Sequence, residues 1–200
     1  MDVLHSVICL SMYHRVVQCI PFRTRNAANL ITCMTFQAWF VYQSGRLFYE
    51  NDDPHFFQTY QNLKYLYGYF LYDLIHLILT DPHYGFIVHH LVGMILIHSF
   101  FQQKPYAVLL RSYQSICFLS EVCSPFLNLR PFLRSTPCYR VYMKCIYYMY
   151  FLFRILLFPI ASFSFYWYTP SLLLAILMST VYGMSLYWFR LLYVSLHLKT

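Results

Sequence analysis

Four ionisable residues lie in two apolar stretches of the chain, and their types suit proton transfer. Asp73 and His76 stand three positions apart, so they are neighbours on one face of a helix. His89 and His90 are adjacent in the next stretch. A histidine oriented by a carboxylate can act as a general base, since imidazole titrates near pH 6.5, close to working pH. The pattern suits acyl transfer, in which the base accepts a proton from an amine or hydroxyl that attacks a thioester.

Two antiparallel helices are needed to bring these four residues together. The short segment 80–83 (TDPH) connects the two stretches, which makes the predicted helices neighbours. Asp73 and His76 precede this turn by about as many residues as His89 and His90 follow it, so we expect all four in one pocket. The alternative is that they only form interhelical hydrogen bonds of about 0.6 kcal/mol each, which fix the packing.

A second set of polar residues follows further along the chain. Glu121 lies in the fifth predicted helix, and Pro125 indicates that this helix bends or ends soon afterwards. Glu121 either faces the same cavity or pairs with Arg154 on the next helix, because ionisable groups at membrane depth need partners. The candidate substrate-binding residues are His76, Glu121, Asn128 and Arg130.

Histidine clusters also bind metals, so a metal site has to be weighed. Membrane desaturases and hydroxylases hold two irons through several H-x-x-H-H and H-x-x-x-H clusters, whereas this chain has one His-His pair, preceded by Phe-Ile-Val. A single zinc site formed by His76, His89 and His90 stays open, although these residues lack a recognised ligand spacing. The seven cysteines form no C-x-x-C pair. We therefore assign no metal and no resident cofactor.

The composition excludes a soluble globular domain. The 200 residues are 60% hydrophobic and only 10% charged, against about 45–50% apolar and about 25% charged in ordinary domains. The 14 Lys and Arg outnumber the 7 Asp and Glu, giving +7, but they stand singly between apolar stretches. No basic face for nucleic acid is assembled. The chain is predicted to be an integral membrane protein.

The apolar stretches predict an all-α bundle. A spanning helix needs about 20 mostly apolar residues. The stretches that meet this need are 26–45, 64–80, 82–103, 107–127 and 145–189, the last of which is long enough for two helices divided at residues 168–171. Residues 1–22 form a weaker span or an interfacial helix, and they fit a signal peptide poorly. We expect seven helices, with residues 23–200 forming the main domain.

The basic residues predict the orientation. One side of the predicted bundle holds nine of them: Arg15, Arg23, Arg25, Arg130, Arg134, Arg140, Lys144, Arg190 and Lys199. The other side holds four: Arg46, Lys64, Lys104 and Arg111. Cytosolic loops carry an excess of Lys and Arg, so the C-terminus and the 130–144 loop are predicted to face the cytosol.

Three motifs resemble those of the TLC domain, the six-helix membrane module that ceramide synthases share with several other membrane proteins. They are GYFLYDL at 68–74, VHHL at 88–91 and EVCSPFLNLRPFL at 121–133, in family order. The resemblance covers about residues 25–196 and is strongest to the small TLC domain-containing proteins. It implies a six-helix TLC-type barrel or bundle, preceded here by one extra helix, and a place in the endoplasmic reticulum.

The same resemblance implies a function in lipid metabolism or lipid homeostasis. His89 and His90 match the catalytic histidines of ceramide synthases, which makes them and Asp73 the candidate catalytic residues. The chain departs from ceramide synthases at 112–121, where only Glu121 matches their acidic segment. Two hypotheses follow. One is a ceramide synthase-like acyltransferase that uses acyl-CoA as co-substrate and acylates a sphingoid or lysolipid. The other is a non-enzymatic protein that binds membrane lipids and regulates membrane composition.

Overall fold

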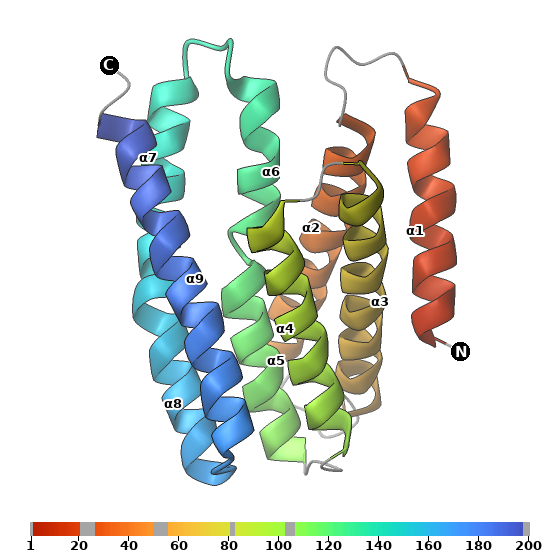
Figure 1. The fold of residues 1–200 in the computed structure, drawn as a ribbon, viewed down its shortest axis with the longest axis vertical. Coiled ribbons are helices and arrows are strands. Elements are labelled where there is room, and N and C mark those ends of the chain that lie inside the picture. The colour runs from red at the N-terminus through yellow and green to blue at the C-terminus, as the bar shows by residue number, and fades with distance from the viewer. Residues whose placement is uncertain (1, 21–26, 50–55, 81–82, 103–106, 198–200) are drawn as a thin grey trace.

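The computed structural model describes residues 2–20, 27–49, 56–80, 83–102 and 107–197, and every element in these ranges is helical (Figure 1). The elements are α1 (Asp2–Gln18), α2 (Ala27–Tyr49), α3 (Phe56–Thr80), α4 (Tyr84–Gln102), α5 (Ala107–Glu121), α6 (Ser124–Leu133), α7 (Tyr139–Tyr150), the π-helical stretch η2 (Phe151–Leu157), α8 (Phe158–Tyr168) and α9 (Leu172–His197). Because α5 and α6 form one broken rod and α7, η2 and α8 another, the described chain has the seven expected helices.

Six of these rods form a closed ring. Around the ring α2 contacts α3, α3 contacts α4, α4 contacts α9, and α9 contacts α7 and α8. The α5–α6 rod closes it by packing against α8 and α7 on one side and α2 on the other. The first helix, α1, lies outside this ring against α3 and α2 (Figure 1). The observed fold is the six-helix barrel that the motifs predicted, with one extra N-terminal helix.

Three helices of the described chain are long and apolar enough to cross a membrane: Tyr84–Phe101, Tyr139–Tyr168 and Leu172–His197. The helices α2, α3 and α5 are less apolar because they carry polar side chains that the ring buries, such as Gln37, Asn62 and Gln114. Such groups are tolerated at membrane depth when they face the bundle interior. The protein is a multi-pass integral membrane protein.

Prolines set the two interruptions that shape the bundle. The α5 helix ends at Glu121 and α6 begins at Ser124, directly before Pro125, because Pro125 has no N–H to donate to the carbonyl of Glu121, four residues earlier. The predicted turn at 168–171 is also present, since α8 ends at Tyr168 and α9 begins at Leu172. The first break places Glu121 at the end of a helix in the middle of the bundle.

The π-helical stretch η2 also lies next to a proline. Pro159 has no N–H to donate to the carbonyl of Ile155, four residues earlier. The hydroxyl of Tyr182 on α9 donates to that carbonyl instead, at 3.4 Å. Wider turns of this kind are frequent at functional sites. Here the stretch carries Arg154, which is buried.

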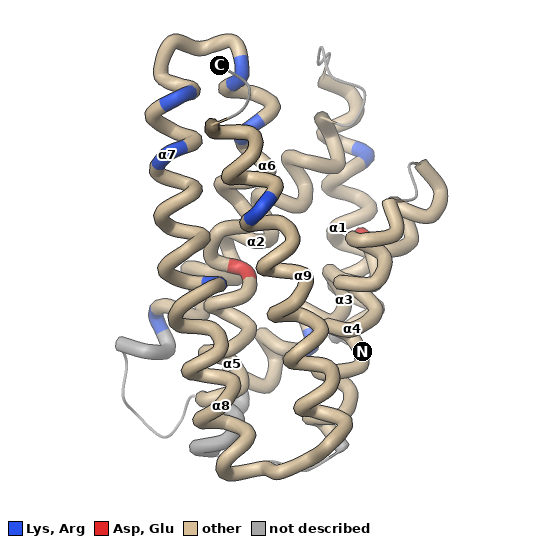
Figure 2. Tube along the Cα trace, turned by 60° about the vertical axis from the view of Figure 1, so that its left-hand side comes forward, with Lys and Arg blue, Asp and Glu red and all other residues tan. Residues whose placement is uncertain are grey.

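The Lys and Arg residues that the structure describes gather toward one end of the bundle. Lys and Arg cluster along α6, α7 and α9 toward one end of the bundle, whereas few lie toward the opposite end (Figure 2). The sequence predicted a separation of this kind, and the side that faces the cytosol stays a prediction. Several residues of that prediction lie outside the described ranges: Arg23, Arg25, Lys104 and Lys199.

Candidate functional site

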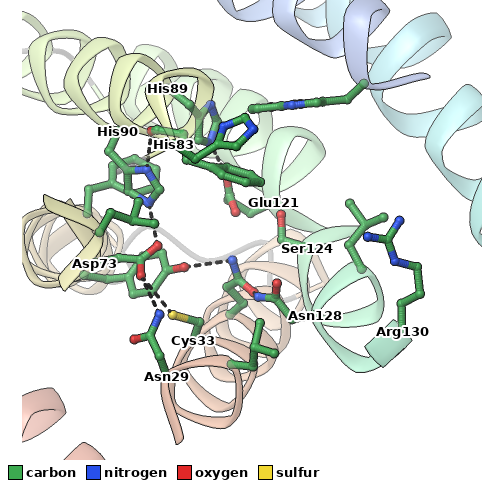
Figure 3. Close-up of a pocket in the computed structure, with 18 of the residues that line it drawn as sticks. Asn29, Cys33, Asp73, His83, His89, His90, Glu121, Ser124, Asn128 and Arg130 are labelled. Carbon is green, nitrogen blue, oxygen red and sulfur yellow. Dashed lines mark hydrogen bonds and ion pairs between the residues drawn. The ribbon is translucent and has the colours of Figure 1, made fainter. Parts of the chain in front are cut away.

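A cavity of about 460 Å³ lies inside the ring, within the range of about 300–1,000 Å³ that is usual for small-molecule sites. Its walls come from α2, α3, α4, α6, η2 and α9, together with the ends of α5 and α7. Phe70, Leu77, Leu127 and Trp188 supply apolar surface. The polar lining gathers around the described histidines and carboxylates (Figure 3). The cavity therefore combines an apolar wall with a compact polar centre.

The Asp73–His90 pair forms the first part of this centre. Asp73 Oδ2 lies 2.9 Å from His90 Nε2, and both side chains are buried. The other ring nitrogen of His90, Nδ1, lies 2.7 Å from the backbone carbonyl of Phe86. A carbonyl oxygen only accepts hydrogen bonds, so Nδ1 carries a proton and Nε2 is the nitrogen that faces the carboxylate. Both nitrogens of His90 are therefore engaged.

Two side chains of α2 hold the other oxygen of Asp73. Asn29 Nδ2 donates to Oδ1 at 3.1 Å, and the Cys33 thiol donates to the same oxygen at 3.3 Å (Figure 3). The carboxylate thus contacts three donors from two helices other than its own. Its orientation is fixed by α2 and α4 together.

His89 forms a second pair with Glu121. Its Nε2 lies 3.5 Å from Glu121 Oε1, while its Nδ1 is buried without a hydrogen-bond partner in the described part of the chain. Arg154 Nη2 lies 3.8 Å from the same carboxylate oxygen and donates to Ser124 Oγ at 2.9 Å. Glu121 is thereby placed between a histidine and a buried arginine. Both sequence alternatives for Glu121 are realised, because it lines the cavity and also lies next to Arg154.

A pair of amides forms the third polar group. Asn128 Nδ2 of α6 donates to Gln37 Oε1 at 2.8 Å, and Gln37 Nε2 donates to the Tyr69 hydroxyl at 2.9 Å. These three residues line the cavity and tie α6, α2 and α3 together. Arg130, two residues further along α6, also lines the cavity (Figure 3).

Six of the seven predicted site residues line this one cavity: Asp73, His89, His90, Glu121, Asn128 and Arg130. His76 does not, and the expected convergence is wrong for it. Residues three apart on a helix point about 60° apart, which is enough to direct His76 to α1, where its ring centroid lies 5.0 Å from that of His14. The zinc site of His76, His89 and His90 is therefore not assembled.

Sequence reasoning missed the contribution of α2. Asn29, Cys33 and Gln37 all line the cavity, and their spacing of four places them on one helical face. That spacing is the signal that would have identified them. Arg154 was expected only as a partner for Glu121, yet it also lines the cavity.

A comparison with protein-family models matches residues 25–194 to the TLC domain. The chain belongs to the TLC domain family. The matched segment contains every residue that lines the cavity, whereas α1 precedes it. No curated protein and no solved structure gave a significant match. The TLC domain is a multi-pass membrane module of a family linked to lipid metabolism, and the apolar ring with its polar cavity agrees with that broad function.

Proposed function

We propose that this TLC domain protein is a lipid acyltransferase, which moves an acyl group from acyl-CoA to an amine or hydroxyl of a membrane lipid. The observation that carries the proposal is the meeting of two histidine–carboxylate pairs in one buried cavity, Asp73–His90 at 2.9 Å and Glu121–His89 at 3.5 Å. Paired titratable groups of this kind in a cavity are typical of acid–base catalysis.

The two histidines receive different roles. His90 contacts Asp73 and the Phe86 carbonyl, so it can accept no proton from a substrate without losing one of these contacts. His89 has a ring nitrogen that no described residue binds, which makes it the better general base. Asp73 acts through His90 and serves as a positioning residue.

The proposed reaction balances without a further reagent. The acceptor nitrogen or oxygen bonds to the acyl carbon as His89 takes its proton, and the carbon–sulfur bond of the thioester breaks. The proton held by His89 then passes to the departing thiolate. Arg154 and Ser124 line the same part of the cavity and supply donors that stabilise the negative charge on the carbonyl oxygen.

A second candidate is a non-enzymatic lipid-binding protein. It is favoured by the Asn128–Gln37–Tyr69 contacts, in which polar groups that line the cavity bind one another. Such a wall is suited to hold a headgroup while the acyl chain lies along the apolar side. Sphingoid and lysolipid molecules fit both candidates, because each has a polar head and one chain.

Acyl-CoA consumption by the protein reconstituted in liposomes distinguishes the two. Wild type, His89→Ala and His90→Ala are assayed with a panel of amine and lysolipid acceptors. His98→Ala is the matched control, since His98 is an exposed residue of α4 that does not line the cavity. We expect a loss of at least about 100-fold for His89→Ala, the usual contribution of a general base. Equal turnover by wild type and His89→Ala rejects the enzyme and leaves the binding protein.

We also propose that the C-terminus and the α6–α7 turn face the cytosol and that the protein lies in the endoplasmic reticulum. The orientation is supported by Arg134 in that turn and by Arg140 in the first turn of α7. Cys138 is exposed there and offers a label. A membrane-impermeant maleimide is expected to modify Cys138 in intact microsomes, as measured by peptide mass spectrometry. Labelling that requires permeabilised membranes contradicts this orientation.

A further inference from the structure

The helix outside the matched domain reaches the polar centre of the cavity through its side chains. His14 of α1 is buried, and its Nδ1 lies 2.5 Å from the hydroxyl of Tyr72 on α3. The Tyr72 hydroxyl in turn donates to Asn29 Oδ1 at 3.1 Å, and Asn29 Nδ2 donates to Asp73 Oδ1 at 3.1 Å. Three successive hydrogen bonds therefore connect α1 with the carboxylate that binds His90.

The donors and acceptors of this hydrogen-bond series agree along its whole length. The Tyr72 hydroxyl donates its one hydrogen bond to Asn29. Its oxygen therefore accepts a hydrogen bond from His14 Nδ1–H. His14 Nε2 then carries the lone pair and accepts from Gln18 Nε2 at 2.7 Å. Because Asn29 Oδ1 accepts the hydrogen bond from the Tyr72 hydroxyl, the Asn29 amide presents its N–H group to Asp73.

Close packing of α1 against α3 keeps the residues of this hydrogen-bond series together. Gly68 of α3 faces Ser6 of α1, and a methyl group at Gly68 would lie 2.7 Å from Ser6 Cβ and 2.9 Å from the backbone oxygen of Val3. The Ser6 hydroxyl also donates to the Tyr65 carbonyl at 3.2 Å. Only glycine permits this approach of the two helices.

We infer that His14 is a positioning residue: α1 orients the Asn29 amide through His14 and Tyr72, and thereby fixes the Asp73–His90 pair. The inference goes beyond the proposed function, since a fixed pair serves a catalytic cavity and a binding cavity alike. It assigns to α1, which precedes the TLC match, a part in building the site.

The test uses the full chain in lipid nanodiscs and two measurements that need no acyl-CoA. The first is the rate of alkylation of the buried Cys33 by N-ethylmaleimide, with the exposed Cys9 as internal standard. The Cys33 thiol donates to the same Asp73 oxygen as Asn29, so a freed Asn29 loosens its surroundings. The second is the ¹⁵N resonance of the His90 imidazole.

Two substitutions of His14 separate its hydrogen bond from its bulk. His14→Asn keeps an N–H near the position of Nδ1, whereas His14→Leu keeps apolar volume and removes the donor. We expect His14→Leu to raise the rate of Cys33 alkylation by about fivefold, which corresponds to the net free energy of one hydrogen bond. It should also shift the His90 resonance. His14→Asn should retain the wild-type values for both. Tyr72→Phe, which removes the next link, should resemble His14→Leu.

Gly68→Ala supplies an independent variant, because it displaces α1 without replacing any residue of the hydrogen-bond series. Its matched control is Gly183→Ala, where an added methyl meets no atom within 4 Å. Gly68→Ala should raise the Cys33 rate and Gly183→Ala should leave it unchanged. If His14→Leu fails to fold, Tyr72→Phe and Gly68→Ala decide the matter.

Two results overturn the inference. If His14→Leu retains the wild-type rate of Cys33 alkylation and the wild-type His90 resonance, α1 only packs against the ring. Equal effects of His14→Asn and His14→Leu mean that the hydrogen bond is not what α1 supplies. Because neither measurement involves catalysis, a failure here is distinct from a failure of the acyltransferase proposal.

Discussion

The Asp73–His90 contact can be tested by a double-mutant cycle, since it gives Asp73 a partner on another helix rather than on its own. Asp73→Asn keeps the size of the side chain and removes its charge. The carboxylate accepts from His90, Asn29 and Cys33. An amide accepts through only one of its two end atoms, so at least one of these buried donors loses its acceptor in either amide orientation.

The magnitude follows from the hydrogen bonds that the substitution removes. A hydrogen bond to a charged group contributes about 1.5–3 kcal/mol, although interhelical bonds in a membrane protein reach only about 1.7 kcal/mol. We therefore expect about 1.5 kcal/mol of coupling between Asp73→Asn and His90→Gln, with the double variant less destabilised than the sum of the two. The control cycle pairs Asp73→Asn with His98→Gln, because His98 is an exposed residue of α4 that does not line the cavity. Its coupling should stay below about 0.5 kcal/mol.

The free energy of unfolding is measured in mixed micelles by titration with SDS. The three tryptophans provide the fluorescence signal, and one of them, Trp188, reports on the site, since its ring centroid lies 5.3 Å from that of His89. Both cycles use the same Asp73 variant, so effects on the unfolded state cancel to a large extent. Coupling to His98 as large as the coupling to His90 would refute the geometry, and so would a value near zero for His90.

Two further substitutions test the surroundings of the pair. Gly93→Ala places a methyl group 2.6 Å from the Phe70 ring, which must then move; we expect a destabilisation of about 1–3 kcal/mol in the same titration, whereas Gly45→Ala, with no atom within 4 Å, should be nearly neutral. Arg154→Met removes the cation 3.8 Å from Glu121 and leaves that carboxylate buried; it should cost about 3–5 kcal/mol, and Glu121→Gln in the same chain should restore part of it. No recovery in the double variant contradicts the ion pair.

The fold was predictable from the sequence because spanning helices have a simple signature. Uncharged stretches of sufficient length located the helices, and the segment 168–171 divided the last long stretch correctly. The π-helical stretch was not predictable from hydropathy. It depends on Pro159 and on the Tyr182 hydroxyl of another helix, and hydropathy carries no information about such contacts.

The site was predictable where charge made residues stand out. Asp73, His89 and His90 are conspicuous in apolar stretches, and a hairpin brings them together. Asn29 and Cys33 are uncharged, so only their spacing of four distinguishes them from packing residues. The error at His76 arose because a shared helical face is broad, and three residues along a helix are enough to turn a side chain toward a different neighbour.

The proposed role of His89 in acting on lipids in this cavity can be tested by lipidomics without assuming the acceptor. Membranes of cells that express wild type, His89→Ala or His98→Ala are compared at matched protein levels. We expect wild type and His98→Ala to raise the same class of acylated lipid and His89→Ala not to do so. Identical lipid profiles for wild type and His89→Ala would contradict it.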